Sequence, residues 1–586
     1  MTQLTKEQQN DLYLRKVALG EVQGEMTGYA SVDKPWLKYY SEEAINSELP
    51  EGTIYEYLLK NSKECSANIA IDYFGKKITY QNIIDKVDMT ARAFWKCGVR
   101  KGDFVTLCVL NTPEIVYSVY ALSKIDAVAD FEYPTIAEQT MYETLQGNHT
   151  KVFIVLSVLK EKFSHAGDYV DKVIVISPDE SMPLSKKIMY KLAAKDRTNN
   201  STGIPFSSFT NMGADKEVEV EENRESAAPV IMVHTGGTTG FPKGVLLSNK
   251  AFNAIAHEYR VSGMKYSKGD SILHGIPPFH AYGFSIGIHM PLILGLTIYM
   301  CVKIDYNSLA KMFRKIKPVH FVGASIHTTT IIDELRDKPF ELSHMKTWAI
   351  GGSSLSKKQL EEATKVLERN HCGTRIVTGY GMSELCATAC TERGDCLKPG
   401  SVGIPLPHVN IKVMDEEQDK ELTYDQVGGI WINSPGIMIG YQDNKEENQK
   451  VFQLDSENVL WIKTGDLASI DQDGFLYLAG RSKRLYSTVY KGLSYKIFPD
   501  NIEKVVMELQ GIKSCAAVCA SDEYRRFIPI LYVVRINDDL QETTIKEYCI
   551  DKLPEHMIPE KILFLGKIPM TAAGKVDYKA LEEKES

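Results

Sequence analysis

The sequence predicts an α/β protein of more than one domain. The chain has 586 residues, which is far above the usual size of a single domain. Strand-like and helix-like segments alternate over the first 180 residues, and this alternation is typical of parallel sheets with helices on both faces. After about residue 400 the segments become shorter and richer in turn residues, which indicates a different architecture.

The alternation is clearest from residue 103 onwards. Residues 103–110, DFVTLCVL, have the composition of a buried strand. The next segment predicts a helix, because Thr112 is a favoured N-cap residue and Pro113 suits the first helical position. Further strand-like segments lie at residues 127–133, 151–157 and 172–178.

Residues 178–228 interrupt this pattern and form a predicted insertion. Within it, Lys186–Lys195 is a short basic amphipathic piece, and an acidic, polar connector follows. A solvated helix is the favoured interpretation of the basic piece, and contact with a lipid surface is the alternative.

The most apolar run, Phe284–Val302, is about long enough to span a bilayer. It contains His289, Pro291 and Gly295, and it lacks flanking clusters of basic residues. These features favour a buried helix, a turn at Pro291 and then a buried strand over a transmembrane segment.

Short strands separated by Gly, Pro and Asp-Gly turns predict a small antiparallel or barrel-like subdomain after residue 400. These strands lie within residues 400–417, 428–441 and 474–484. A mixture of helices and strands then predicts a separate C-terminal domain. Its helices are expected at 500–510 and 541–554, and its strands at 514–521 and 527–536.

The composition is that of an ordinary folded protein, with 44% hydrophobic and 25% charged residues. A net charge of −8 and a pI near 6.0 argue against a nucleic-acid partner, which would require a basic surface. The N-terminus is polar and lacks the apolar core of a signal peptide. Together with eleven cysteines, this favours reduced thiols and a cytoplasmic location.

A Gly- and Thr-rich stretch at residues 234–249, HTGGTTGFPKGVLLSN, suits a phosphate-binding loop. It is not a Walker A loop, because Lys243 is followed by Gly244 where that loop needs Ser or Thr, and the dinucleotide fingerprint is also missing. Small residues would let backbone N–H groups approach an anion, and Lys243 would add a positive charge. Hydroxyl donors come from Thr235, Thr238 and Thr239.

Three more motifs follow in order: GYGMSEL at 379–385, TGDLASIDQDGFLYLAGRSKR at 464–484 and TAAGKVDYKAL at 571–581. Together with TGGTTGFPKG they resemble the signature motifs of the adenylate-forming superfamily, which includes acyl-CoA synthetases, peptide-synthetase adenylation domains and luciferases. Ser383 stands where the superfamily has threonine. The resemblance extends from about residue 55 to residue 581, with weaker matches at 277–283, 351–356 and 400–407.

The resemblance implies a more detailed architecture. Residues 1–481 would form a large N-terminal AMP-binding domain of two parallel-type α/β subdomains and a small β-barrel-like subdomain, with the insertion at about 178–228. Residues 482–586 would form a small, mobile α+β C-terminal domain that carries the catalytic lysine. Lys483 would be the hinge between them.

The resemblance also assigns the phosphate end of ATP. The residues that would hold the β- and γ-phosphates are Thr235, Gly236, Gly237, Thr238, Thr239, Gly240 and Lys243. Glu384 would bind Mg²⁺, since a carboxylate together with phosphate oxygens is how this ion is usually held. Ser383 would contact the α-phosphate. Lys575 would bridge the α-phosphate and the attacking carboxylate as negative charge develops on the leaving pyrophosphate.

At the nucleoside end, the resemblance implies that Asp466 accepts hydrogen bonds from the ribose hydroxyls with the help of Arg481. Adenine would lie along a short glycine-rich segment, Gly351, Gly352 and Ser353. The loop of Tyr380, Gly381 and Met382 would complete the nucleotide site and form one wall of the acid pocket.

The acid substrate is constrained by the element PPFHAYG at 277–283. Amino-acid-activating members usually carry an Asp near this element, whereas its His280 resembles the acyl and aryl acid branches. We expect His280 to contribute to the catalytic centre as a gate or pocket-wall residue rather than as a proton shuttle. Residues 323–335 would form another wall.

One departure from the family follows Arg481. The hairpin at 485–498 is longer than the family's, and Ser494 stands where a glycine commonly lines the thiol tunnel. Gly492 is the alternative occupant of that role. The departure concerns the thioester step more than the adenylation step.

Four cysteines lie near the catalytic loop: Cys372, Cys386, Cys390 and Cys396. A zinc site would explain the cluster, but the spacings include no Cys-x-x-Cys pair. Buried thiols without a metal are therefore favoured.

The sequence thus predicts an ATP-dependent carboxylic acid–CoA ligase for a fatty or other non-amino acid. It would act through an acyl-adenylate, with release of pyrophosphate and AMP, and would use ATP, Mg²⁺ and coenzyme A. Two alternatives stay open. One is an enzyme that loads an acyl or aminoacyl group onto a carrier protein, and the other is an inactive sensor of nucleotides or acyl groups.

Overall fold

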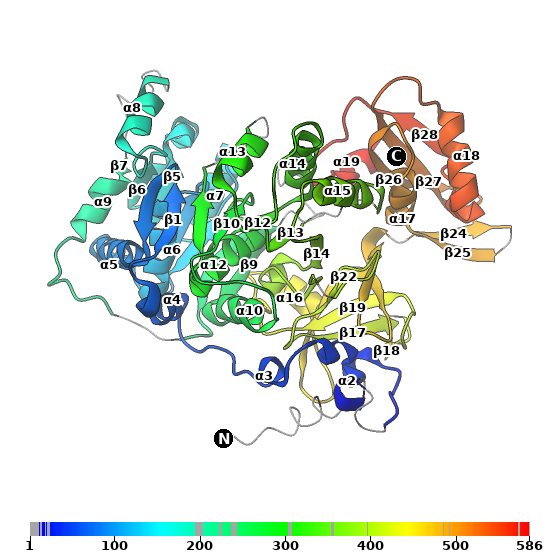
Figure 1. Cartoon of the computed structure of the whole chain (residues 1–586), viewed down its shortest axis with the longest axis horizontal. Helices are drawn as coiled ribbons and strands as arrows, with labels where there is room; N and C mark the ends of the chain where they lie inside the picture. The colour runs from blue at the N-terminus through cyan, green and yellow to red at the C-terminus, as the bar shows by residue number, and fades with distance from the viewer. Residues whose placement is uncertain are drawn as a thin grey trace.

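The structure is a computed structural model that describes residues 11, 15–17, 19, 24–193, 203–221, 225–235, 243–302, 308–352, 355, 357–394, 396–415, 417–484, 486–491, 493–571 and 575–584. The N-terminal part fills the left and centre of Figure 1, and a smaller C-terminal part, orange to red, lies at the upper right. This arrangement confirms the predicted mixed α/β architecture with a large N-terminal and a small C-terminal part.

The first large sheet has eight strands in the order β20-β9-β8-β4-β3-β5-β6-β7. The strands from β8 to β7 in this order run parallel, whereas β9 and β20 are antiparallel to their neighbours. The strands are β3 (Phe104–Cys108), β4 (Val128–Phe131), β5 (Val152–Leu156), β6 (Lys172–Ile176), β7 (Ile204–Pro205), β8 (Pro229–Thr235), β9 (Lys243–Ser248) and β20 (Gly440–Tyr441). The strands expected at 103–110, 127–133, 151–157 and 172–178 are confirmed as β3 to β6.

The second large sheet has nine strands in the order β16-β15-β14-β13-β12-β10-β11-β1-β2. Its six central strands are parallel, and β2, β15 and β16 are antiparallel. The strands are β1 (Ile69–Tyr73), β2 (Lys76–Thr79), β10 (Ser271–His274), β11 (Thr297–Met300), β12 (His320–Gly323), β13 (Thr347–Ile350), β14 (Ile376–Tyr380), β15 (Cys390–Thr391) and β16 (Ile404–Pro405).

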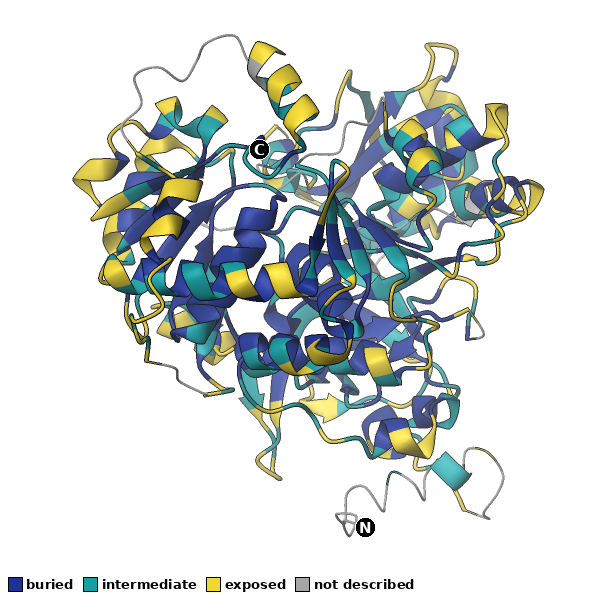
Figure 2. Cartoon of the chain, turned by 60° about the vertical axis from the view of Figure 1, so that its left-hand side comes forward, coloured by how far each residue is buried: buried dark blue, intermediate teal, exposed yellow. Residues whose placement is uncertain are grey.

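Helices cover these sheets, and Figure 2 shows the buried strands in dark blue behind helices with exposed outer faces. They are α4 (Ile54–Ser62), α5 (Tyr80–Lys96), α7 (Glu138–Gly147), α10 (Asn249–Val261), α13 (Leu309–Ile316), α14 (Ser325–Asp337) and α15 (Lys357–Arg369). Helix α6 (Pro113–Lys124) is buried on almost every side, and its sequence therefore lacks the polar face of a surface helix. It begins at Pro113 after Thr112, as predicted, although the Thr112 side chain makes no capping hydrogen bond.

The apolar run 284–302 is a helix followed by a strand, but the predicted turn at Pro291 is wrong. Helix α11 (Ala281–Phe284) continues through a π-helical turn, Ser285–His289, into α12 (Met290–Leu294). Pro291 lies two residues after the π-helical turn, where the regular hydrogen-bond pattern is already interrupted, so its missing N–H costs less than in an uninterrupted helix. The chain turns instead at Gly295, whose φ of 79° suits glycine. In the described part of the chain, no helix is long and apolar enough to cross a membrane.

The subdomain expected after residue 400 is an antiparallel sheet with the order β18-β17-β19-β22-β21 and with β23 beside β22. Its strands are β17 (Asn410–Asp415), β18 (Lys420–Glu421), β19 (Gly428–Asn433), β21 (Phe452–Leu454), β22 (Leu460–Ile470) and β23 (Leu476–Arg481). Helix α16 (Lys445–Val451) links β20 to β21.

The C-terminal part contains the predicted helices and strands. They are α17 (Pro499–Val506), β26 (Ile512–Asp522), β27 (Arg526–Arg535), α18 (Glu542–Lys552), β28 (Lys561–Phe564) and α19 (Tyr578–Glu582). The long hairpin consists of β24 (Tyr486–Tyr490) and β25 (Leu493–Ile497), in which Ser494 pairs with Val489. Gly492 lies outside the described residues.

The described residues of the predicted insertion include helices α8 and α9. Helix α8 (Leu184–Ala193) lies after β6, and α9 (Phe206–Met212) lies after β7. Helix α8 stands at the upper left end of the molecule in Figure 1.

Candidate active site

The predicted phosphate loop joins two paired strands. Strand β8 ends at Thr235 and β9 begins at Lys243, and these two residues are partners across the antiparallel pair. Because β8 runs parallel to β4, the loop leaves the carboxyl edge of the sheet, which is where ligands bind in open α/β sheets. The loop residues Gly236, Gly237, Thr238, Thr239 and Gly240 lie outside the described residues.

Lys243 contacts two residues that the sequence analysis missed. Its ammonium forms an ion pair with the Glu447 carboxylate and lies over the Tyr441 ring, 4.9 Å from the ring centroid. Hydrogen bonds from Lys243 and Lys450 lower the pKa of the Glu447 carboxyl to about 2. No local sequence signal links these residues, because the pairing of β20 with β9 brings Tyr441 beside Val245.

Glu384 lies in a 3-10 turn, Ser383–Leu385, that follows β14, and it is buried. The Tyr441 hydroxyl donates a 2.8 Å hydrogen bond to the Glu384 carboxylate. The Met438 N–H donates a 2.8 Å hydrogen bond to the Glu384 carbonyl. Hydrogen bonds therefore fix both the side chain and the backbone of Glu384. Ser383 directly precedes it in the turn.

The backbone around this turn is tight. A Cβ on Gly381 would lie 1.6 Å from the Ala387 carbonyl oxygen, so only glycine fits there. Cys386 and Ala387 have φ values of 54° and 113°, which side chains disfavour. Tyr380 ends β14, and Met382 precedes the turn. Strained backbone of this kind clusters at functional sites.

Asp466 and Arg481 are direct partners across strands β22 and β23. The Arg481 Nε lies 3.1 Å from one carboxylate oxygen of Asp466, and the Tyr380 hydroxyl donates a 2.6 Å hydrogen bond to the other. Burial raises the pKa of the Asp466 carboxyl, while Arg481 opposes that rise. The structure thus brings together three residues predicted to bind the nucleotide.

Gly351 and Gly352 follow β13. The Gly351 N–H donates a 3.0 Å hydrogen bond to the Gly323 carbonyl, and a Cβ on Gly351 would lie 2.7 Å from the ring of Tyr282. Gly352 has a φ of 74°. Tyr282, which the sequence analysis missed, therefore leaves room only for glycine at position 351. Ser353 lies outside the described residues.

His280 precedes α11 and packs among aromatic rings. Its ring centroid lies 4.8 Å from that of Phe279 and 5.6 Å from that of Tyr133. Burial, with a smaller effect of the positive charge on Lys575, lowers the pKa of His280 to about 4. The imidazole is therefore neutral near pH 7, which suits a pocket wall better than a proton shuttle.

Lys575 reaches this site from the C-terminal part of the chain. Its backbone is fixed by Thr571, whose N–H donates a 2.7 Å hydrogen bond to the Lys575 carbonyl. Although Lys575 is solvent-exposed, surrounding protein atoms and Arg481 lower the pKa of its ammonium, whereas Glu384 and Asp466 act in the opposite sense. Lys575 therefore lies within electrostatic range of the predicted metal ligand and of both predicted ribose residues.

Lys483 lies at the connection between the two parts of the chain, in a 3-10 turn after β23. On one side Arg481 belongs to β23. On the other side Arg484 forms ion pairs with Asp500 and, at 2.7 Å, with Glu503, both in α17. Lys483 thus follows Arg481, whose side chain pairs with Asp466 and whose N–H donates a 3.1 Å hydrogen bond to Asp500, and precedes Arg484, whose side chain is bound by α17.

A buried charged cluster lies under the start of the phosphate loop. The His234 Nε2 lies 2.7 Å from the Asp130 carboxylate and 3.2 Å from that of Glu132. Although burial alone would lower the pKa of His234, the two carboxylates raise it to about 9, and burial raises the pKa of Glu132 to about 7. The Tyr133 hydroxyl donates a 2.7 Å hydrogen bond to the His234 carbonyl. A protonated imidazole therefore lies beside Asp130 and Glu132 directly before Thr235.

The cysteines near the catalytic loop are largely buried. Cys386, Cys390 and Cys396 are buried, and Cys372 is partly buried. Burial raises the pKa of the Cys386 and Cys390 thiols, so both are protonated at neutral pH.

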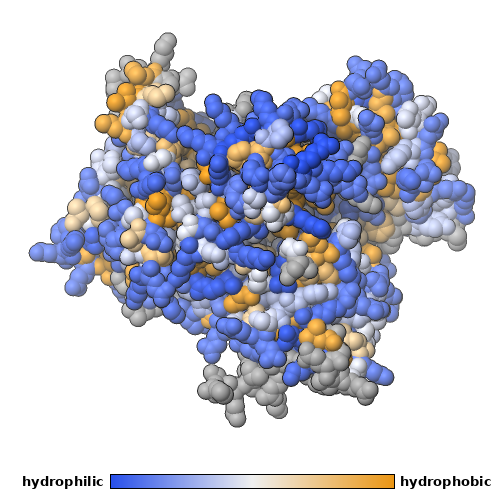
Figure 3. Space-filling view, in the orientation of Figure 1, coloured by the Kyte–Doolittle hydropathy of each residue, from blue (hydrophilic) through white to orange (hydrophobic). Residues whose placement is uncertain are grey.

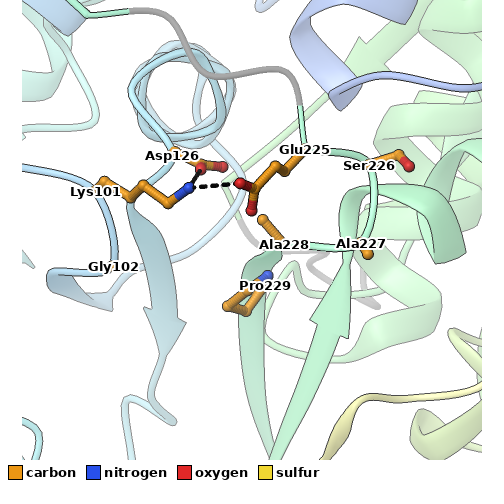
Figure 4. A pocket seen from close by; sticks show the side chains of 8 residues that line it. All are labelled: Lys101, Gly102, Asp126, Glu225, Ser226, Ala227, Ala228 and Pro229. Carbon is orange, nitrogen blue, oxygen red and sulfur yellow. Dashed lines mark hydrogen bonds and ion pairs between the residues drawn. The ribbon is translucent and has the colours of Figure 1, made fainter.

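A hollow of about 560 Å³ lies away from these residues (Figure 4). It is lined by Lys101, Asp126, Glu225 and Pro229 among others, and Lys101 forms ion pairs with Glu225 at 2.9 Å and with Asp126 at 3.3 Å. Pro229 begins β8, whereas the phosphate loop follows its end. The hollow therefore lies at the opposite edge of the sheet from the candidate active site.

Comparison with known families matches both parts of the chain. The model of the AMP-binding enzyme family matches residues 59–442, and the model of the AMP-binding enzyme C-terminal domain matches residues 501–575.

Known proteins match over most of their length. The long-chain-fatty-acid–CoA ligase of Bacillus subtilis (strain 168) is 26% identical over 573 residues, which cover 94% of this chain and 98% of the relative. The 4-coumarate–CoA ligase 3 of Arabidopsis thaliana is 26% identical and covers 87% of each chain. The crystal structure of ATP-bound MatB from Rhodopseudomonas palustris has the same fold, with a TM-score of 0.77, 20% identity and coverage of 91% of this chain and 98% of that one.

Proposed function

We propose that the chain, which belongs to the AMP-binding enzyme family, is an ATP-dependent carboxylic acid–CoA ligase. An oxygen of the acid attacks the α-phosphorus of ATP, the bond to the bridging oxygen breaks, and pyrophosphate leaves. The coenzyme A thiol then attacks the acyl-adenylate carbonyl, and AMP leaves. The observation that carries the proposal is the approach of Lys575 to Glu384 and Asp466 from another part of the chain.

The proposed roles at the nucleoside follow from the contacts. Asp466 binds the ribose hydroxyls, with Arg481 beside it and the Tyr380 hydroxyl fixing its orientation. Gly351 and Gly352 line adenine, where any Cβ at position 351 would strike Tyr282. We also propose Ser353, Gly381 and Met382 for this site, on the family resemblance.

Lys243 and the loop from Thr235 to Gly240 bind the β- and γ-phosphates in this proposal. Glu447 then competes with ATP, because its carboxylate and the ATP phosphates bind the same Lys243 ammonium. Since a phosphate group carries more negative charge than one carboxylate, ATP binding should displace Glu447 from Lys243.

Glu384 is the proposed ligand of Mg²⁺. Its buried carboxylate is an oxygen ligand of the kind that Mg²⁺ prefers. The neutral Tyr441 hydroxyl orients this carboxylate through one hydrogen bond. When bound, the ion would neutralise charge on the phosphate oxygens.

Lys575 and Ser383 act at the reacting centre. The Lys575 ammonium offsets the negative charge that the acid oxygen and the α-phosphate bring together, and Ser383 donates its hydroxyl to the α-phosphate.

The acid is a fatty or aryl acid in this proposal. The names of the two relatives support it, because one acts on long-chain fatty acids and the other on 4-coumarate. Neutral His280, among Phe279 and Tyr133, would form an apolar wall that suits such acids.

The thioester step needs a different arrangement of the two parts. We propose a domain boundary at residues 481–482, with Lys483 as the hinge about which Lys575 leaves the site. We also propose a cytoplasmic location. The alternative acceptor is the thiol of a carrier protein.

A screen of pyrophosphate release tests the function. It uses short, medium and long fatty acids, aryl acids and amino acids, each with and without coenzyme A. We expect release with a fatty or aryl acid and an acyl-CoA product. Adenylate without acyl-CoA would favour the carrier protein, and no release with any acid would favour an inactive sensor.

A further inference from the structure

Helix α8 presents a stripe of large apolar side chains to solvent. Leu184, Met189 and Leu192 are 74%, 69% and 75% exposed, and Ile188 is 52% exposed. Residues four apart lie on one face of a helix, so Leu184, Ile188 and Leu192 form a continuous line. Figure 3 shows apolar side chains gathered at the upper left, where Figure 1 shows α8.

The opposite side of α8 is anchored to the protein. The Lys186 ammonium donates a 2.7 Å hydrogen bond to the Phe74 carbonyl and lies 5.4 Å from the centroid of the Phe74 ring. Tyr190 packs against the main hydrophobic core. The helix is therefore fixed on the body of the protein with its apolar stripe turned outward.

The sequence of α8, LSKKIMYKLA, carries three lysines and no acidic residue. The whole chain has a net charge of −8, so this helix differs in sign from the rest of the molecule. Half-exposed Lys187 borders the stripe, and the third lysine of the helix follows it by four positions in the sequence. An apolar face bordered by lysines is complementary to an anionic lipid surface.

The segment that follows α8 in the sequence is polar. Residues 194–202, AKDRTNNST, contain no large apolar residue. Val158, another apolar residue, is 69% exposed in the turn after β5. Since the last residues of β5 and β6 pair in parallel register, Val158 and the start of α8 share one edge of the sheet.

This edge is also the one that carries the candidate active site. Strands β8 and β6 both belong to the parallel part of the sheet, so the phosphate loop and α8 leave from the same side. Four strand spacings separate them, which is roughly 19 Å.

We propose that α8 is a peripheral membrane contact that lies in the interface of an anionic phospholipid bilayer. The apolar stripe enters the boundary between headgroups and acyl chains, and the lysines on its border contact lipid phosphates. This contact is independent of the chemistry at the active site.

Co-sedimentation of the full chain with vesicles tests this. The probes are vesicles of phosphatidylcholine alone and of equal parts phosphatidylcholine and phosphatidylglycerol. We expect binding to the anionic vesicles that weakens with added salt. Replacing Leu184, Ile188, Met189 and Leu192 together by Ser should reduce the partition coefficient by about a hundredfold.

Two further variants sharpen the experiment. Lys187→Glu with Lys191→Glu reverses the charge beside the stripe and should abolish the preference for anionic vesicles. A matched control replaces four exposed apolar residues outside α8 by Ser and should bind as the wild type does. The control positions are Val427, Tyr524, Ile536 and Ile550.

Four results would overturn the proposal. They are no binding of the wild type to either vesicle, equal binding of the Ser variant, equal binding to neutral vesicles, and self-association that the Ser variant abolishes. The last result would show that a second copy of the chain covers α8. Pyrophosphate exchange by the Ser variant checks that it is folded.

Discussion

The Tyr441 hydroxyl donates a 2.8 Å hydrogen bond to the carboxylate of Glu384. The same ring lies under the Lys243 ammonium. One neutral residue therefore contacts both the proposed metal ligand and the proposed pyrophosphate-binding lysine, and it fixes their separation.

Replacing Tyr441 by Phe removes this hydrogen bond and keeps the ring under Lys243. Groups that orient a metal ligand typically account for about 10- to 100-fold in metal affinity or activity, so the Mg²⁺ concentration for half-maximal pyrophosphate exchange should rise by about that factor. Tyr477→Phe is the control, because Tyr477 lies in a different sheet and the change removes a 3.1 Å hydrogen bond to Asp471. An unchanged Mg²⁺ dependence in Tyr441→Phe would contradict the role.

Gly381→Ala should inactivate the enzyme without unfolding it. The added Cβ would lie 1.6 Å from the Ala387 carbonyl oxygen, so the turn that holds Glu384 must move. Since a displacement of about 1 Å can cost about a hundredfold in rate, we expect at least that loss in kcat. Gly394→Ala, where no atom of the described residues lies within 4 Å of the new Cβ, should keep wild-type activity. Equal activity of the two variants would show that the turn tolerates the change.

His234→Gln should lower the free energy of unfolding by about 3–5 kcal/mol at pH 6.5, because it leaves the buried Asp130 carboxylate without its cation. The carboxylates raise the pKa of His234 from 6.5 to about 9. Its stabilising effect is therefore full below pH 6.5 and is lost as the pH rises through 9. The difference in stability between wild type and variant should shrink over that interval in urea denaturation.

His257→Gln is the matched control for this pH dependence. Burial lowers the pKa of His257 to about 4, so it stays neutral throughout the interval. Its difference from the wild type should not change between pH 6.5 and 9. If the His234→Gln difference were equally constant, the imidazole would not be charged in the folded protein.

Local sequence signals predicted much of the fold and the residues proposed for the site. Pro113 after Thr112 marked the start of α6, because both preferences act within a few residues. The motifs around Glu384, Asp466 and Lys575 predicted residues that the structure brings within electrostatic range of one another.

Contacts between distant segments could not be predicted in this way. Tyr441 and Glu447 reach Glu384 and Lys243 only because β20 pairs with β9. The predicted position of the turn, at Pro291, was wrong for a related reason. The π-helical turn before Pro291 interrupts the regular hydrogen-bond pattern, so the helix continues past the proline and the chain turns at Gly295.

The most direct test of the central claim is the Lys575→Ala variant in the two half-reactions. We expect pyrophosphate exchange to fall by about a hundredfold or more, because one positive charge is removed from the reacting centre. Conversion of supplied acyl-adenylate to acyl-CoA should stay close to the wild-type rate. Lys567→Ala, an exposed lysine on the same domain, is the control and should change neither rate. Wild-type pyrophosphate exchange in Lys575→Ala would contradict the account.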